Sequence, residues 1–547
     1  MSDGTMDRRA FLECTTMSGA AVAAGPALPA LARGVSRSTE RVTAPFELEE
    51  ATIAGLQAGL EAGKYTARSL VTAYLQRIDE LDRKGPTLRA VLEANPDALA
   101  QAAALDAERK AKGPRGPLHG IPVLVKDNVA TRDRMQSTAG SLALSGVTPP
   151  RDAFLVERVR AAGAVLLGKA NLSEWANFRS TRSSSGWSGR GGQCRNPYAL
   201  DRTPSGSSSG SGVAVAANLC AVAIGTETDG SIVSPSTCCG IVGIKPTLGL
   251  VSRSGVIPIA HSQDTAGPMA RTVADAAILL GVLAGVDARD EATAASAGRS
   301  RTEYTSVLDP AGLKGARLGV CRSRFMGYSP ATDALMEGAI DALKRVGAVI
   351  VDPADITTAG QFDDSEFAVL LYEFKADLNK YLGEWAPTAG AKTLEDLIAF
   401  NERTKDKEMP YFGQEIFIQA QAKGPLTDQD YLRALDKNHL LARSQGIDTV
   451  MADHQLDALI APTGGPASLI DLVNGDPGGG GSFSSPAAVA GYPHVTVPMG
   501  HVRGLPVGLS FVGRPWTEAA LIKYAFAYEQ ATKARRPPRF ATSADLA

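Results

Sequence analysis

Short apolar runs alternate with stretches of helical periodicity in the first half of the chain, and this alternation constrains the fold more than any other feature. Residues 120–126 (GIPVLVK), 164–168 (AVLLG) and 222–224 (VAI) have the pattern of buried strands. Apolar residues recur at helical spacing near 96–112 and again just before the second of these runs. Strands that alternate with helices predict a layered α/β fold.

The flanking regions extend this pattern to both ends. A helical lead-in is predicted over 49–81, apolar strands near 458–460 and 495–497, and a last helix over 518–533. The segment from about 290 to 450 is more polar and rich in helical patterns. Because no long charge block or Pro/Gly linker divides the middle, we predict a single domain over 46–540 in which residues 290–450 cover the site.

The amino terminus has the pattern of a targeting signal. Residues 8–12 (RRAFL) precede an Ala-rich stretch that ends in Ala30-Leu31-Ala32, a small-x-small cleavage pattern. This resembles a twin-arginine export signal over 1–32 and predicts an exported, periplasmic protein. The alternative is a disordered tail on a cytoplasmic protein.

Composition excludes several classes of partner. Lys plus Arg (56) nearly balance Asp plus Glu (58), so a net charge of -2 gives no broad positive field for nucleic acid. No apolar run reaches the length of about 20 residues that a membrane span requires. The histidines and cysteines lack the spacing of metal sites, so we expect no metal and no cofactor, with free and mostly buried thiols at Cys14, Cys194, Cys220, Cys238, Cys239 and Cys321.

A glycine- and serine-rich segment over 180–212 allows two interpretations. As low complexity it would be a flexible linker. Apolar, helix-compatible sequence follows at once in 213–219, which favours tight turns around a site. Within the segment, residues 206–210 satisfy G-x-S-x-G and would make Ser208 the nucleophile of an α/β-hydrolase. That elbow needs a strand running into it, and the preceding sequence is strand-poor.

Three segments together resemble the amidase signature family: 206–212 (GSSSGSG), 225–232 (GTETDGSI) and 120–128 (GIPVLVKDN). Ser207 and Ser231 lie 24 positions apart, as in that family. Residues 240–247 (GIVGIKPT), 264–269 (DTAGPM) and 490–493 (AGYP) continue the resemblance, which covers most of 46–535. The family's fold is a mixed β-sheet core covered by helices on both faces. Within the family, 171–180 (NLSEWANFRS) is similar to the bacterial peptide amidases.

The resemblance implies a role for each matching residue. Ser231 is the nucleophile, Ser207 is a proton relay behind a cis peptide bond from Gly206, and Lys126 is the base. The backbone N–H groups of Thr228, Asp229, Gly230 and Ser231 are the implied oxyanion hole. For this role the lysine must be neutral, so its pKa must fall well below the usual value of about 10.4. The neighbouring Asp127 would oppose that, and we expect it to point elsewhere.

The chain also departs from the family pattern. Val233 stands where many members have Arg, and Cys238-Cys239 stand where small or polar residues are usual. We expect the cysteines to pack in the core. His261 is a lone loop histidine, for which a structural role is the expectation.

These features predict an amidohydrolase that releases ammonia from a primary carboxamide through an acyl-enzyme, with C-terminal amides of peptides as substrates. The alternatives are small aliphatic or aryl amides, the glutaminase subunit of an amidotransferase, a catalytically inactive binding protein on the same scaffold, and the Ser208 hydrolase. Acyl-side specificity and oligomeric state are open at this level.

Overall fold

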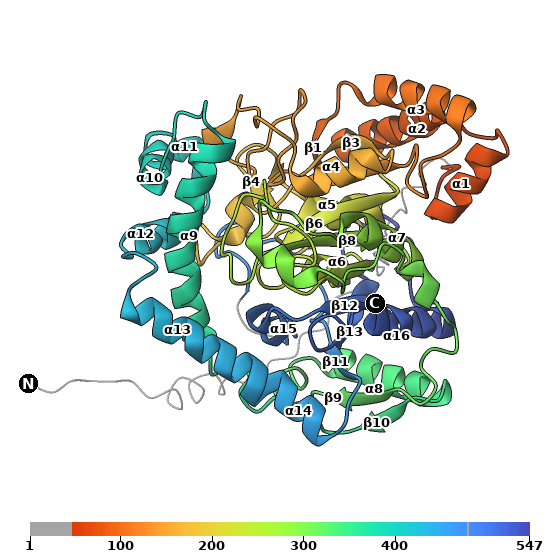
Figure 1. Ribbon diagram of the computed structural model, residues 1–547, viewed down its shortest axis with the longest axis vertical. Coiled ribbons are helices and arrows are strands. Elements are labelled where there is room, and N and C mark those ends of the chain that lie inside the picture. Colours follow the sequence, from red (N-terminus) through yellow and green to blue (C-terminus); the bar gives the residue numbers. More distant parts are fainter. Residues whose placement is uncertain (1–45, 478–480, 547) are drawn as a thin grey trace, which may run out of the picture. The chain divides into compact units, whose positions relative to one another are not determined.

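The computed structural model describes residues 46–477 and 481–546. In this part of the chain the centre is an 11-stranded sheet (Figure 1). A separate two-stranded ribbon pairs β4 (Trp187–Ser188) with β5 (Gly192–Gln193). In the order of the large sheet, its strands are β1 (Val91–Ala94), β3 (Val165–Ala170), β2 (Pro122–Lys126), β6 (Val222–Glu227), β8 (Thr265–Ala270), β7 (Val242–Lys245), β12 (His494–Val502), β13 (Leu505–Val512), β11 (Ala458–Pro462), β9 (Arg317–Val320) and β10 (Val349–Val351).

The sheet is mixed, as predicted. Strand β2 runs parallel to both β3 and β6, whereas β6 and β7 each pair with β8 in antiparallel fashion. Every residue of β2, β3, β6, β7 and β8 is buried. Because successive strand residues point to opposite faces, both faces of this part of the sheet are covered. The prediction of an α/β fold with helices on both faces is confirmed.

Helices surround the sheet and continue into the predicted helix-rich segment. Figure 1 shows α9 to α12 along the left of the view and α13 and α14 along its lower edge, outside the sheet. The α-helices are α1 (Ile53–Glu61), α2 (Ala67–Ile78), α3 (Ala98–Lys112), α4 (Phe154–Ala161), α5 (Ser209–Ala216), α6 (Val233–Cys238), α7 (Val273–Leu283), α8 (Pro330–Arg345), α9 (Asp363–Trp385), α10 (Leu394–Arg403), α11 (Lys405–Glu408), α12 (Glu415–Gln421), α13 (Gln429–His439), α14 (Asp448–Asp453), α15 (Ser485–Ala490) and α16 (Glu518–Thr532).

The amino-terminal lead-in consists of two helices. Thr52 caps α1, and Thr66 forms a capping box with Ser69 at the start of α2. Each side-chain oxygen accepts a backbone N–H that the first helical turn leaves without a partner. The local sequence therefore defines where each helix begins.

The predicted export signal over residues 1–32 lies outside the described residues. Among the described helices, none combines the length and the apolar character needed to cross a membrane.

Candidate active site

The side chain of Lys126 lies at the carboxyl end of a buried parallel strand. Strand β2 pairs with β6 in a register that places Val125 opposite Ile224, so Lys126 reaches the end of β6 near Thr226. Its Nζ lies 2.8 Å from Ser207 Oγ, 2.9 Å from Thr226 Oγ1 and 3.3 Å from the Thr226 carbonyl oxygen. The structure thus brings the predicted base and relay into hydrogen-bonding contact.

Complete burial lowers the pKa of Lys126 to about 7, although the charges of Asp264 and Glu227 act in the opposite direction. Asp127 contributes little to this balance because its carboxylate points away. It accepts hydrogen bonds from the Thr138 hydroxyl and the Gly140 N–H, and it lies 3.5 Å from Arg190 Nη1. The expected orientation of Asp127 is confirmed, and a neutral Lys126 is accessible near neutral pH.

Ser207 follows the predicted cis peptide bond from Gly206. A Cβ atom at Gly206 would lie 2.2 Å from Ser173 Oγ, so only glycine fits there. The Ser207 carbonyl accepts the Ser173 N–H at 3.0 Å, and the side chain is fully buried. These contacts hold the backbone of Ser207, whose hydroxyl lies 2.8 Å from Lys126 Nζ.

Ser231 lies on the loop between β6 and α6 and is 7% exposed, whereas Ser207 has no exposed surface. Gly230 has a φ of +76°, and a Cβ there would lie 2.9 Å from Ser234 Oγ. The Ser208 N–H donates to the Ser231 carbonyl at 3.1 Å, which ties this loop to the Gly/Ser segment. Among the described residues no hydrogen bond joins the Ser207 and Ser231 hydroxyls, so the two segments meet through the backbone.

The backbone N–H groups of residues 228–231 share one property. Across the part of the chain that the structure describes, none of them donates a hydrogen bond within the protein. The next two N–H groups, of Ile232 and Val233, both donate to Glu227 Oε2, at 2.7 and 3.0 Å. Four consecutive N–H groups beside a serine are therefore free to bind an oxyanion.

Side chains around this loop hold its shape. The Thr228 hydroxyl donates to Asp264 Oδ1 at 2.5 Å, and Asp264 Oδ2 accepts the N–H groups of Ile259 and Ala260 at 2.8 and 3.0 Å. Burial raises the pKa of Asp229, whose carboxyl group faces that of Glu366. Two acidic groups so close share a proton more readily than they both ionise.

Ser208, the candidate of the alternative hydrolase, occupies a different setting. Its hydroxyl donates to the Thr226 carbonyl at 3.0 Å, and the residue is fully buried. The three residues before Gly206 form no strand. A strand-to-helix elbow is thus absent here, and Ser208 has the contacts of a structural residue.

Several residues of the site were not singled out from sequence. Thr226 and Asn128 contact one another beside Lys126, with Asn128 Nδ2 donating to Thr226 Oγ1 at 2.9 Å. Both lie inside the motif segments 120–128 and 225–232, and this position is the sequence signal that could have identified them. Glu408 lies outside these contacts and had no such signal: it comes from the helix-rich segment and accepts the Ser141 hydroxyl at 3.0 Å. Only the tertiary fold brings that residue to the core.

The remaining candidates have structural environments. Cys194, Cys220, Cys238, Cys239 and Cys321 are free and buried, as expected, and Cys14 lies outside the described residues. His261 Nδ1 lies 2.8 Å from Asp377 Oδ2, and its Nε2 lies 3.4 Å from Glu373 Oε1. The ligand atoms of these three residues lie within 4.8 Å of one another. Because a single metal ion would bind one ring nitrogen, carboxylates at both nitrogens fit an ion-paired imidazolium better.

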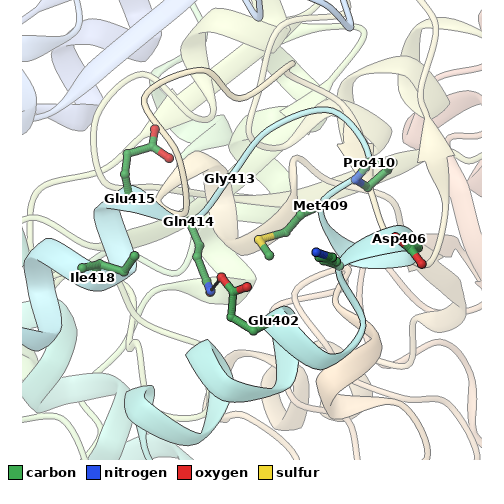
Figure 2. A pocket seen from close by; sticks show the side chains of 9 residues that line it. Glu402, Asp406, Met409, Pro410, Gly413, Gln414, Glu415 and Ile418 are labelled. Carbon is green, nitrogen blue, oxygen red and sulfur yellow. Dashed lines mark hydrogen bonds between the residues drawn. The ribbon is translucent and has the colours of Figure 1, made fainter.

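A surface cavity of about 530 Å³ lies in the covering segment, between the end of α10 and α12. Figure 2 shows Glu402, Met409, Gln414 and Ile418 in its lining, with a hydrogen bond of 3.0 Å from Gln414 Nε2 to Glu402 Oε1. Its lining contains neither Lys126 nor either of the predicted catalytic serines. This cavity is separate from the candidate active site.

The chain resembles known proteins over most of its length. It is 43% identical over 514 residues to a "probable amidase" of Arabidopsis thaliana, an alignment that covers 92% of this chain and 94% of the relative. It is 38% identical to a glutamyl-tRNA(Gln) amidotransferase subunit of Chloroflexus aurantiacus, with 89% and 98% covered. The solved structure of native peptide amidase from Stenotrophomonas maltophilia is 54% identical, with a TM-score of 0.87 and coverage of 91% of this chain and 100% of that chain.

The family model described as Amidase matches residues 69–522, a range that includes Lys126, Ser207 and Ser231. An amide-hydrolysing enzyme needs a nucleophile, a base and an oxyanion site, and the geometry above offers a group for each. The chain therefore belongs to the amidase family and is a hydrolase of amide bonds.

Proposed function

We propose that this enzyme hydrolyses a primary carboxamide to an acid and ammonia, with Ser231 as nucleophile, Ser207 as relay and Lys126 as base. The observation that carries the proposal is the 2.8 Å contact between Lys126 Nζ and Ser207 Oγ in a fully buried setting. A serine hydroxyl is a weak nucleophile at neutral pH and needs a base within reach. Burial supplies that base, because it lowers the pKa of Lys126 to about 7.

In the proposed first half of the reaction, protons pass from Ser231 through Ser207 to Lys126 and then return by the same route. Ser231 Oγ attacks the amide carbon while its proton passes to Ser207, and the Ser207 proton passes to Lys126. The carbonyl oxygen becomes an oxyanion, which the free N–H groups of residues 228–231 can bind. When the C–N bond breaks, the proton returns by the same route to the departing nitrogen, so ammonia leaves and an ester to Ser231 remains.

In the second half, water replaces the amine. Its proton follows the same path to Lys126 as its oxygen attacks the ester carbon. The C–O bond to Ser231 then breaks, the serine regains its proton, and the acid is released. The enzyme ends in its starting protonation state.

C-terminal amides of peptides are the substrates we propose. Support comes from the 54% identity to a peptide amidase over 91% of this chain. The 38% identity to a component of an amidotransferase keeps glutamine as a second candidate amide. Simple aliphatic and aryl amides are the third.

Ammonia release over a panel of peptide amides, glutamine, and aliphatic and aryl amides tests the proposal. We expect release from peptide amides without internal cleavage, and its loss in Ser231→Ala and in Lys126→Ala. Ser211→Ala is the matched control, because this buried serine of the same segment donates to the Ile224 carbonyl at 3.0 Å, away from Lys126. Activity retained in Ser231→Ala or in Lys126→Ala would refute the proposed triad. Labelling of Ser231 by a fluorophosphonate would exclude an inactive scaffold.

We also propose export through the twin-arginine pathway, supported by the sequence pattern of residues 8–32. Replacing Arg8 and Arg9 by lysines should leave the full-length protein in the cytoplasm. Equal periplasmic amounts of the variant and the unmodified protein in cell fractions would count against this pathway.

A further inference from the structure

The surroundings of Lys126 Nζ match the protonated lysine atom for atom. An ammonium group has three N–H donors. Three oxygens lie within reach: Ser207 Oγ at 2.8 Å, Thr226 Oγ1 at 2.9 Å and the Thr226 carbonyl at 3.3 Å. Thr226 thus supplies two of the three acceptors, and both lie on one residue at the end of β6.

In the neutral form of Lys126, the direction of the nitrogen lone pair decides whether it can accept the proton of Ser207. The neutral amine has two N–H donors and one lone pair, and the relay works only if the lone pair faces Ser207. A carbonyl oxygen can only accept, so the Thr226 carbonyl holds one N–H. The second N–H can point at the hydroxyl of either Ser207 or Thr226. Only in the second case does the lone pair meet the Ser207 proton.

Asn128 holds the Thr226 hydroxyl, and this hydroxyl competes with that of Ser207 for the second N–H of Lys126. Its Nδ2 donates to Thr226 Oγ1 at 2.9 Å, from a position only 3% exposed in the turn after β2. The Thr226 N–H is held as well, by Ser208 Oγ at 3.2 Å. The Thr226 oxygen therefore has one position, facing Nζ.

We propose that Thr226 is a positioning residue for Lys126: its carbonyl and hydroxyl accept two N–H groups so that the third position of the nitrogen faces Ser207, and Asn128 holds that hydroxyl in place. This inference rests on the proposed role of Lys126 as base. Thr226 and Asn128 then determine where the Lys126 lone pair points and thus the direction of proton transfer.

The test is the pH dependence of ammonia release from a peptide amide. We expect kcat/KM to rise with pH as Lys126 loses its proton, and we call this rise the acid limb. Loss of an acceptor destabilises the ammonium form and lowers the Lys126 pKa. Thr226→Val should therefore move the acid limb to lower pH, by about half to one unit. It should also lower kcat about tenfold or more with KM nearly unchanged. Thr226→Ser should restore the limb, and Asn128→Ala should shift it in the same direction but less.

Other charges near the nitrogen stay constant in these variants. Asp264, from the loop before β8, and Glu227, from β6, are the charged groups that act on Lys126. Thr265→Val is the matched control, since this buried threonine of β8 lies opposite Glu227 in the sheet and its hydroxyl lies 3.5 Å from the Ala266 carbonyl. It should leave the limb in place.

An unmoved limb in folded Thr226→Val overturns the inference, and so does a limb displaced to higher pH, which would mean that the hydroxyl donates to the amine. If Thr226→Val fails to fold, as judged by its melting temperature, the Asn128→Ala shift decides in the same way. Lys126→Ala and Ser231→Ala are assayed alongside. If they stay active, the proposed triad fails; if they are inactive while the limb does not move, only the inference about Thr226 and Asn128 fails.

Discussion

Lys126 and Lys245 are two buried lysines at the ends of neighbouring parts of one sheet, and they differ in what surrounds the nitrogen. Both are fully buried, and burial lowers the pKa of Lys126 to about 7 and that of Lys245 to about 8. Among the described residues, the hydrogen-bond acceptors of Lys245 Nζ are all carbonyl oxygens: Tyr492 at 2.7 Å, Ala487 at 3.3 Å and Pro246 at 3.5 Å. Lys126 contacts two hydroxyls and one carbonyl.

This difference fits a structural cation at Lys245 and the proposed proton acceptor at Lys126. Carbonyl oxygens only accept, so three of them hold an ammonium and offer nothing to a lone pair. A hydroxyl can donate or accept, so the nitrogen beside it can exchange a proton without losing its partner. Burial alone therefore does not identify a catalytic lysine; the donors and acceptors around it do.

The largest expected effect comes from exchanging each lysine for methionine. Lys126→Met should lower ammonia release by about 10²- to 10⁴-fold, as loss of a general base does. Lys245→Met should instead lower the free energy of unfolding, on the order of 3 kcal/mol, because buried carbonyls and the nearby Glu227 and Glu518 lose their cation. Activity assays and urea unfolding of both variants check this.

The stability of Lys126→Met has a definite dependence on pH. The folded pKa of about 7 lies below the unfolded value of about 10.4, so the unfolded chain binds more protons between these values. The lysine therefore costs stability, most fully below about pH 7, and the cost fades as pH rises toward 10.4. The free energy of unfolding of Lys126→Met minus that of the unmodified protein should therefore be more positive at pH 7 than at pH 9.5. The opposite trend would contradict a lowered pKa for Lys126.

The pH profile of activity gives the second effect. Since the amine must be neutral to act, kcat/KM should rise with pH along a limb centred near the Lys126 pKa of about 7. Burial also lowers the pKa of Lys169, to about 8. Its nitrogen, however, contacts the Val129 carbonyl and Ser137 Oγ and neither of the proposed catalytic serines among the described residues. Lys169→Met should keep the midpoint of the limb. A midpoint that follows Lys169 would reassign the base.

The sequence indicated which segments meet around Lys126 better than it indicated the contacts that support them. The segments that hold Lys126, Ser207 and Ser231 are continuous motifs, and the apolar run before Lys126 already implied a desolvated amine. The strand ends at Lys126 and Glu227 meet because β2 and β6 are parallel neighbours, which the α/β pattern allowed but did not specify.

The contacts that hold the site together were beyond reach for a physical reason. Asp264 meets Thr228 across 36 positions, and Glu408 meets Ser141 across 267. Such pairs have no periodicity or spacing in the sequence, because the tertiary fold alone sets them. The segment over 290–450 was predicted to be polar and helix-rich, yet nothing in its pattern indicated that Glu408 is buried.

A smaller effect tests how far charge, as distinct from hydroxyls, sets the pKa of Lys126. Burial raises the pKa of Asp264 to about 6, so it is ionised at pH 8, where it raises the pKa of Lys126. Asp264→Asn should therefore move the acid limb to lower pH. It should also lower kcat about tenfold, because the Thr228 loop loses part of its support. An acid limb that stays in place would show that the Asp264 charge does not act on Lys126.

The smallest effect belongs to His261, a cation on the loop that leads to Asp264. Burial lowers the pKa of His261, but the hydrogen bond to Asp377 and the charges of Asp377 and Glu373 outweigh it, so the pKa is raised. The pair therefore stabilises the fold below the unfolded pKa of about 6.5, and this is lost as pH rises through the folded value. Because the side chain is 44% exposed, solvent limits the effect to less than about 1 kcal/mol.

His261→Gln should reduce the free energy of unfolding at pH 5.5 more than at pH 8.5. Asp377→Asn should diminish the same difference between the two pH values, and equal losses at both would mean that His261 acts by packing and not by charge.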